Sequence, residues 1–187
     1  MQADNQLSGQ LQSPSASPNW LAALRAYLLT VAVIDLLWEM AHLPLYTLWR
    51  AGTPGEKLFA VLHCTGGDLL IALASLIFVL MLVGHRDWPV RRFAAVAAVT
   101  LVFGFGYTVF SEWLNVVVRK SWTYSDLMPV ISIFGLSIGV SPLLQWMAVP
   151  TLALYVSRRA GASDMHNPET ETVIGQQQIP ASRKERT

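Results

Sequence analysis

The sequence has little cysteine and little charge, and both shortages exclude whole classes of protein. Its 187 residues include one cysteine, Cys64, so neither an intrachain disulfide nor a multi-cysteine metal site can form. Only 13% of the residues are charged, whereas a soluble domain carries about 25%. The formal net charge of +1 argues against a nucleic-acid-binding protein.

Hydrophobic residues take the place of the missing charges. They make up 53% of the chain, and the mean hydropathy is +0.42. Long apolar stretches predict an all-α integral membrane protein, a four-span transmembrane helical bundle over residues 19–157. The expected spans are residues 21–49, 58–84, 93–118 and 141–156. Pro44, in the last turns of the first span, predicts a kink or an early helix end.

Three segments do not fit a regular span. Residues 1–18 and 158–187 are polar, which predicts disordered tails, and the first of them lacks the basic region of a signal peptide. Residues 130–140 are interrupted by Gly135 and Gly139. They form either a short re-entrant or interfacial segment or the start of one tilted, kinked last helix. The two glycines also make a GxxxG pair, which is typical of close helix packing.

The distribution of Lys and Arg predicts the orientation. With four spans, the N-terminus, the loop at residues 85–92 and the C-terminus share one side, which holds nine of the 13 basic residues. Because basic residues favour the cytoplasmic side, we expect a multi-pass protein of the inner (plasma) membrane with both termini in the cytoplasm.

Polar residues form a stripe on the first predicted span. Asp35, Glu39 and His42 are spaced i, i+4, i+7, so their side chains lie within about 40° of each other on one helix face. Carboxylates and an imidazole are costly in a bilayer, so they should face partners or water rather than lipid.

The next two spans carry matching groups. At about 1.5 Å per residue, His63 and Asp68 on the second span and Glu112 and Asn115 on the third reach the depth of that stripe, in the outer half of the bilayer. The sequence therefore predicts one buried carboxylate/histidine site. Residues 121–126, SWTYSD, either cap this site or form an interfacial loop with aromatic anchors.

The residue types suggest two kinds of chemistry. A divalent metal (zinc, iron or manganese) would take carboxylate and imidazole ligands, and Glu39 and His42 have the Glu-x-x-His spacing of di-metal bundles, which however use two such motifs. Without a metal, buried carboxyl groups could act as acid and base. As an alternative to both, these residues could form a structural network that only makes hydrogen bonds between neighbouring helices. The candidate metal ligands are Glu39, His42, His63, Asp68 and Glu112. The candidate catalytic residues are Glu39, His42, Asp68 and Glu112. The expected pocket residues are Asp35, Tyr107, Trp113, Asn115 and Gln145.

Three functional hypotheses follow from this site. The first is a membrane-embedded enzyme that acts on a lipid or isoprenoid-like substrate by metal-assisted or acid/base chemistry. The second is a small accessory or assembly subunit of a membrane complex, and the third is a proton- or cation-coupled transporter. The expected partners are membrane lipids, an apolar small molecule, and either further copies of the chain or a larger membrane complex, with no nucleic acid.

Overall fold

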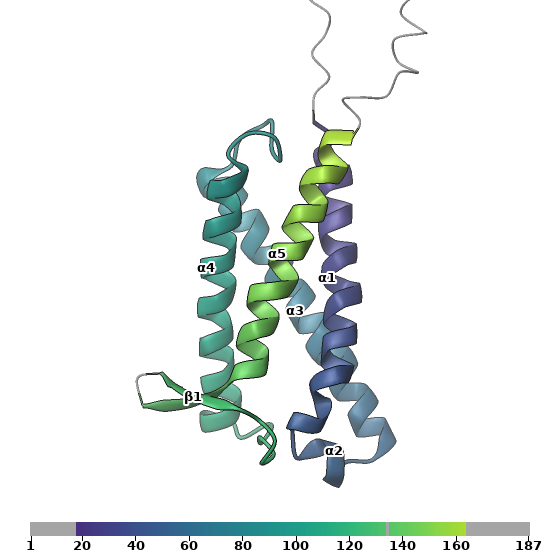
Figure 1. Cartoon of the computed structure of the whole chain (residues 1–187), viewed down its shortest axis with the longest axis vertical. Coiled ribbons are helices and arrows are strands. Elements are labelled where there is room, and N and C mark those ends of the chain that lie inside the picture. The colour runs from purple at the N-terminus through teal and green to yellow at the C-terminus, as the bar shows by residue number, and fades with distance from the viewer. Residues whose placement is uncertain (1–17, 134, 164–187) are drawn as a thin grey trace, which may run out of the picture.

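A four-helix bundle forms the body of the protein in the computed structural model, which describes residues 18–133 and 135–163. Four helices are long and apolar enough to cross a membrane, as predicted (Figure 1). They are α1 (Trp20–His42), α3 (Pro54–Val83), α4 (Phe93–Glu112) and α5 (Val140–Ser163). The tails predicted at residues 1–17 and 164–187 lie outside the described residues.

Each of the four long helices packs on two of the others. Helix α5 runs along α1 and also packs on α4, while α3 packs against both α1 and α4. The backbone N–H of Asn19 donates to the carbonyl oxygen of Gly161 at 3.2 Å, so the described chain begins and ends at one end of the bundle, here called the termini end. The opposite end carries residues 43–57, 113–133 and 135–139 and is called the hairpin end.

The connections at the hairpin end follow from local sequence signals. Helix α1 stops just before Pro44, as predicted, and continues as the 3₁₀ turn η1 (Leu43–Leu45) and the short helix α2 (Leu48–Ala51). Helix α3 begins with a capping box, in which Thr53 and Glu56 each bond the backbone N–H of the other. Helix α4 passes directly after Glu112 into the π-helix η2 (Trp113–Val118), a geometry frequent at functional sites.

The segment before the last helix is a β-hairpin. Strand β1 (Val130–Ile133) pairs with β2 (Leu136–Gly139) in antiparallel register, with Val130 opposite Gly139. The alternative of one kinked helix through this region is therefore wrong. The GxxxG pair also lies in the hairpin rather than on a helix face, and Gly135 has a φ of +81°, a backbone conformation that glycine adopts without strain. Helix α5 extends to Ser163, so residues 158–163 are helical rather than part of the predicted tail.

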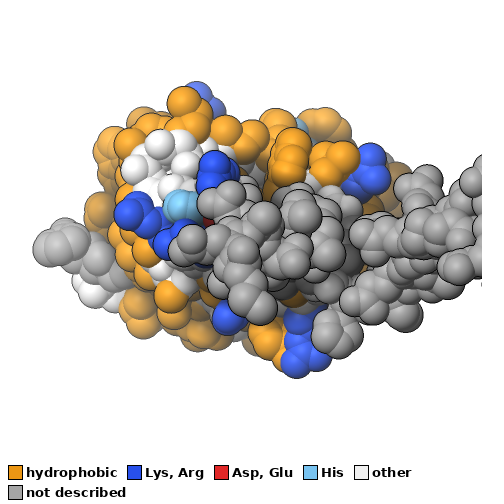
Figure 2. Space-filling view, turned by 90° about the horizontal axis from the view of Figure 1, so that it is seen from above, with side chains coloured by type: hydrophobic (Ala, Val, Ile, Leu, Met, Phe, Trp, Pro, Cys, Tyr) orange, Lys and Arg blue, Asp and Glu red, His pale blue; other side chains and the backbone are white. Residues whose placement is uncertain are grey.

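Apolar side chains lie on the surface of the bundle as well as in its core, as in a membrane protein. Large apolar side chains such as Leu29, Leu70, Met81 and Val102 are exposed on the helices. The core beneath them contains fully buried apolar residues such as Leu76 and Leu154. Figure 2, seen from the termini end, shows Lys and Arg side chains near the edge of the described surface and hydrophobic side chains around the flanks. A polytopic membrane protein is compatible with this pattern.

Close packing of α4 on α5 depends on one glycine. A Cβ atom at Gly104 would lie 2.4 Å from Cζ3 of Trp146, whereas a Cβ at Gly106, two residues along, would meet nothing within 4 Å. We expect Gly104→Ala to lower the free energy of unfolding by about 1–3 kcal/mol relative to Gly106→Ala, because the Trp146 ring must move. Thermal unfolding of both variants in detergent measures this difference. Equal midpoints would show that α5 can shift without cost.

Candidate functional site

The buried faces of α1 and α4 change from apolar to polar towards the hairpin end. Along α1 the buried residues recur every four positions, with Ala23, Tyr27 and Val31 followed by Asp35 and Glu39. Helix α4 repeats the pattern, since Val96, Thr100 and Gly104 are followed by Thr108 and Glu112. Both helices run from the termini end to the hairpin end, so their polar halves lie at the same level.

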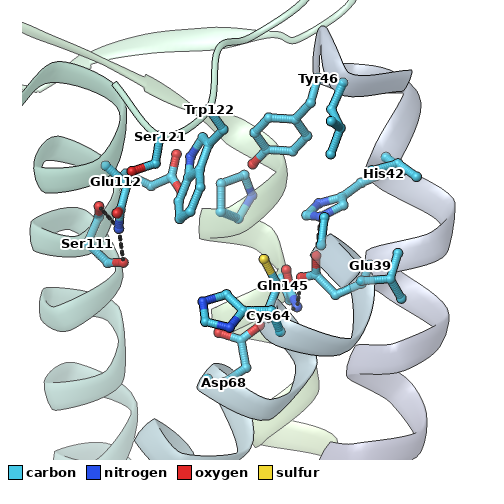
Figure 3. Close-up of a pocket in the computed structure, with 18 of the residues that line it drawn as sticks. Glu39, His42, Tyr46, Cys64, Asp68, Ser111, Glu112, Ser121, Trp122 and Gln145 are labelled. Atoms are coloured by element: carbon cyan, nitrogen blue, oxygen red, sulfur yellow. Dashed lines mark hydrogen bonds and ion pairs between the residues drawn. The ribbon is translucent and has the colours of Figure 1, made fainter. Parts of the chain in front are cut away.

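A cavity of about 760 Å³ occupies this level of the bundle. Eight of the ten predicted site residues line it: Glu39, His42, His63, Asp68, Tyr107, Glu112, Asn115 and Gln145. Figure 3 labels five of them, Glu39, His42, Asp68, Glu112 and Gln145. Asp35 does not line the cavity but lies against Gln145. Trp113 is also absent from the lining and packs on Phe110, with ring centroids 5.8 Å apart.

Three carboxylates converge on the side-chain amide of Gln145. Its Nε2 atom lies 3.1 Å from Oδ1 of Asp35, 3.0 Å from Oε1 of Glu39 and 3.2 Å from Oδ2 of Asp68. An amide nitrogen has two N–H groups to donate, so it cannot give a separate proton to each of three acceptors. Three ionised carboxylates this close together would also repel each other strongly in a low-dielectric interior. We infer that this trio, Asp35, Glu39 and Asp68, holds at least one proton.

A second chain of hydrogen bonds leads from the trio to the start of α5. The second oxygen of Glu39, Oε2, lies 3.0 Å from Nε2 of His42. Nδ1 of His42 lies 3.0 Å from Oγ of Ser141, which also accepts a bond of 3.2 Å from Nε1 of Trp38. Because both ring nitrogens of His42 have partners, the imidazole is held in one orientation beside the cavity.

Glu112 belongs to a separate network on the opposite wall. The hydroxyl of Tyr124 donates to Oε2 of Glu112 and accepts a 3.0 Å bond from the backbone N–H of Gly139. Burial, and then the neighbouring Glu112 carboxylate, raise the pKa of Tyr124, so its hydroxyl stays protonated and keeps donating. One tyrosine therefore ties α4 to the hairpin.

The loops add residues to the site that the helical spacing did not identify. Tyr46 points its hydroxyl into the cavity, and Ser121 and Trp122 line the cavity from the segment after η2. Of the two alternatives for residues 121–126, the structure therefore favours the cap. Tyr46 and Tyr124 carry no sequence signal of their own, because periodicity describes only residues within one helix and both lie outside the four long helices. Ser141 lies one turn before Gln145 on α5, so its i, i+4 spacing is a signal that could have identified it.

The proposed metal site is not formed by these side chains. Among residues 18–133 and 135–163, no group of three or more His, Cys, Asp or Glu residues could hold a metal ion. The carboxylates of the trio surround an amide nitrogen, and His63 is exposed and stacks on Phe59 at 5.3 Å between ring centroids. The prediction of zinc, iron or manganese thus gains no support from the geometry.

No protein-family model, curated protein or solved structure matches the chain. Its function therefore has to be argued from the cavity.

We infer that the cavity opens sideways, between α3 and α4. Phe59 on α3 and Tyr107 on α4 both line the cavity, and they are 67% and 46% exposed. Both lie within the membrane-spanning helices, so this opening faces the region that lipid chains would occupy. Gly67 also lines the cavity, and a Cβ atom there would meet nothing within 4 Å, so this glycine leaves space beside Asp68.

Removal of the Gln145 amide tests its role among the carboxylates. We expect Gln145→Leu to lower the free energy of unfolding by about 3 kcal/mol or more, because three buried carboxyl groups lose their shared donor. Denaturant unfolding in detergent measures the loss. Adding Asp35→Asn should recover part of it, since the amide removes one charge and supplies a donor. A variant as stable as the wild type would contradict the inferred arrangement.

Proposed function

We propose that this protein is a membrane-embedded enzyme that catalyses proton transfer on a lipid or isoprenoid-like substrate. The observation that carries the proposal is a lipid-facing cavity with carboxyl groups on two opposing walls. Glu39 and Asp68 stand on one side and Glu112 on the other, as Figure 3 shows. Apolar walls formed by residues such as Leu43, Val61 and Ile71 suit a hydrocarbon substrate.

The two walls differ in how they handle protons. The trio holds at least one proton, so Glu39 or Asp68 can donate it to a carbon–carbon double bond. Glu112 accepts a hydrogen bond from Tyr124, and in its carboxylate form it would remove a proton from the substrate. Donation of one proton and removal of another from an adjacent carbon would move the double bond without an oxidant or reductant.

His42 has a supporting role in this scheme. It lies 3.0 Å from Glu39 and is within the cavity lining, so it can return a proton to Glu39 after each cycle. Ser141 holds the other ring nitrogen and keeps the imidazole in place. Glu112 would then release to water the proton that it removed from the substrate, and water would supply His42 with the proton that it passes to Glu39.

The burial of the acids favours an enzyme over an accessory subunit. Asp35, Glu39 and Glu112 are only 4%, 7% and 6% exposed, so they cannot form a polar surface for docking. Transport is also less well supported. Between the cavity and the termini end, the described helices pack through fully buried apolar residues such as Val31, Leu76 and Val149.

The main test compares lipids from cells that express different variants. We expect the wild-type protein to generate a lipid species that is absent with Glu112→Gln, because the amide cannot accept the proton. Untargeted mass spectrometry of membrane extracts measures the difference, and equal expression and unfolding midpoints control for folding. Identical lipid profiles, with both proteins folded, would overturn the proposal.

A steric block tests whether the cavity is the place of reaction. Gly67→Leu should abolish the new lipid species, because its side chain grows into space beside Asp68. Gly66→Leu is the matched control, since Gly66 is exposed, also has nothing within 4 Å of its Cβ position, and does not line the cavity. Equal product levels in the two variants would place the chemistry elsewhere.

A further inference from the structure

The cavity has several donors at its hairpin end and carboxylates at its floor. The acid close to those donors, Glu112, already accepts a hydrogen bond from Tyr124. The floor of the cavity carries the carboxylates of Glu39 and Asp68, held through Gln145. The cover at the hairpin end contributes different groups, from the segment after η2 and from the turn after α1. The residues with donor groups that line the cavity there are Arg119, Trp122 and Tyr46. Figure 3 shows Trp122 and Tyr46 at this end.

Two of these donors lack an acceptor within the described part of the chain. Nε1 of Trp122 is buried and has no hydrogen-bond partner there. An indole N–H can only donate, so a buried one normally finds an acceptor. Arg119 lines the same cavity three residues earlier, and no acid among residues 18–133 and 135–163 forms an ion pair with it.

The third donor is kept in its donating form. Burial raises the pKa of Tyr46 well above its usual value, and the carboxylate of Glu112 and the hydroxyl of Tyr124 raise it further. Its hydroxyl therefore stays protonated, and in Figure 3 it points into the cavity beside Trp122. The neighbouring acid at the rim, Glu56, is already bonded to the backbone N–H and hydroxyl of Thr53.

We propose that the cavity binds a lipid with an anionic phosphate headgroup, held by Arg119, Trp122 and Tyr46, with its hydrocarbon chain leaving between α3 and α4. A guanidinium binds phosphate oxygens through paired N–H groups, and the indole and phenol supply neutral donors. The floor carboxylates would repel the same headgroup, so it cannot bind there. Phe59 and Tyr107 flank the path of the chain. The inference rests on the proposed function, because it names the substrate class of the same cavity.

Binding to the purified full-length protein tests this assignment. The probes are 1-oleoyl-lysophosphatidate, mono-oleoylglycerol, which has the same chain without phosphate, and inorganic phosphate, which has no chain. In detergent, by calorimetric titration, we expect lysophosphatidate to bind about tenfold or more tightly than the neutral lipid, as one charge-assisted contact would provide. Inorganic phosphate should not compete at equal concentration. Equal affinity for the two lipids would overturn the headgroup assignment, and competition by phosphate alone would overturn a lipid as the source.

Variants distinguish a specific headgroup site from nonspecific electrostatic attraction of the anionic lipid to basic residues. Arg119→Gln and Trp122→Phe should each weaken lysophosphatidate binding by about tenfold. Lys120→Gln is the matched control, because it removes a positive charge one residue away that does not line the cavity. Equal losses in Arg119→Gln and Lys120→Gln would contradict the site. Unfolding midpoints confirm that each variant is folded.

The binding test and the lipid-profile test fail independently. If lysophosphatidate binds as expected but the lipid profiles are identical, the headgroup site stands and the enzyme proposal falls. If the wild type generates a new lipid species but lysophosphatidate binds no better than the neutral lipid, the enzyme proposal stands and the anionic headgroup falls.

Discussion

The burial of carboxylates inside a lipid-facing bundle is the constraint on which the rest of the structure depends. Transfer of a carboxylate from water into hydrocarbon costs roughly several kcal/mol, unless the group is hydrogen-bonded or protonated. Here the amide of Gln145 meets the oxygens of Asp35, Glu39 and Asp68, each within 3.2 Å. Those three residues come from α1 and α3 and the amide from α5, so the amide also fixes how three helices are arranged.

The remaining polar groups of the site, Glu112 on α4 and His42 on α1, are hydrogen-bonded by residues at the hairpin end. Glu112 at the end of α4 is bonded by Tyr124, which in turn accepts the backbone N–H of Gly139 in the hairpin. His42 is fixed by Ser141 at the first turn of α5. The hairpin end is thus built around hydrogen bonds, whereas the termini end is built around apolar contacts such as those of Tyr27, Leu76 and Leu154. This division leaves a cavity at one end and a solid core at the other.

Much of the bundle could be predicted from hydrophobic length and spacing. The four spans and the early end at Pro44 are confirmed, because bilayer thickness and proline geometry act locally along the chain. The stripe of Asp35, Glu39 and His42 is buried, since its spacing places it on one face. The hairpin could not be distinguished from a broken helix by its sequence. Residues 130–139 form a short, mostly apolar run, and periodicity alone does not assign such a run to a strand or a helix. The antiparallel pairing of β1 with β2 is seen only in the structure.

The sequence by itself determined that polar groups must lie inside an apolar bundle, and which helix faces carry them. Only the tertiary structure decided what those groups bond. Periodicity places residues on a face, but it does not rotate one helix against another, so the convergence of two helices on Gln145 is a product of packing. For the same reason Tyr46, Trp122 and Tyr124 join the site only through the fold, because they belong to loops whose position depends on the helices beneath them.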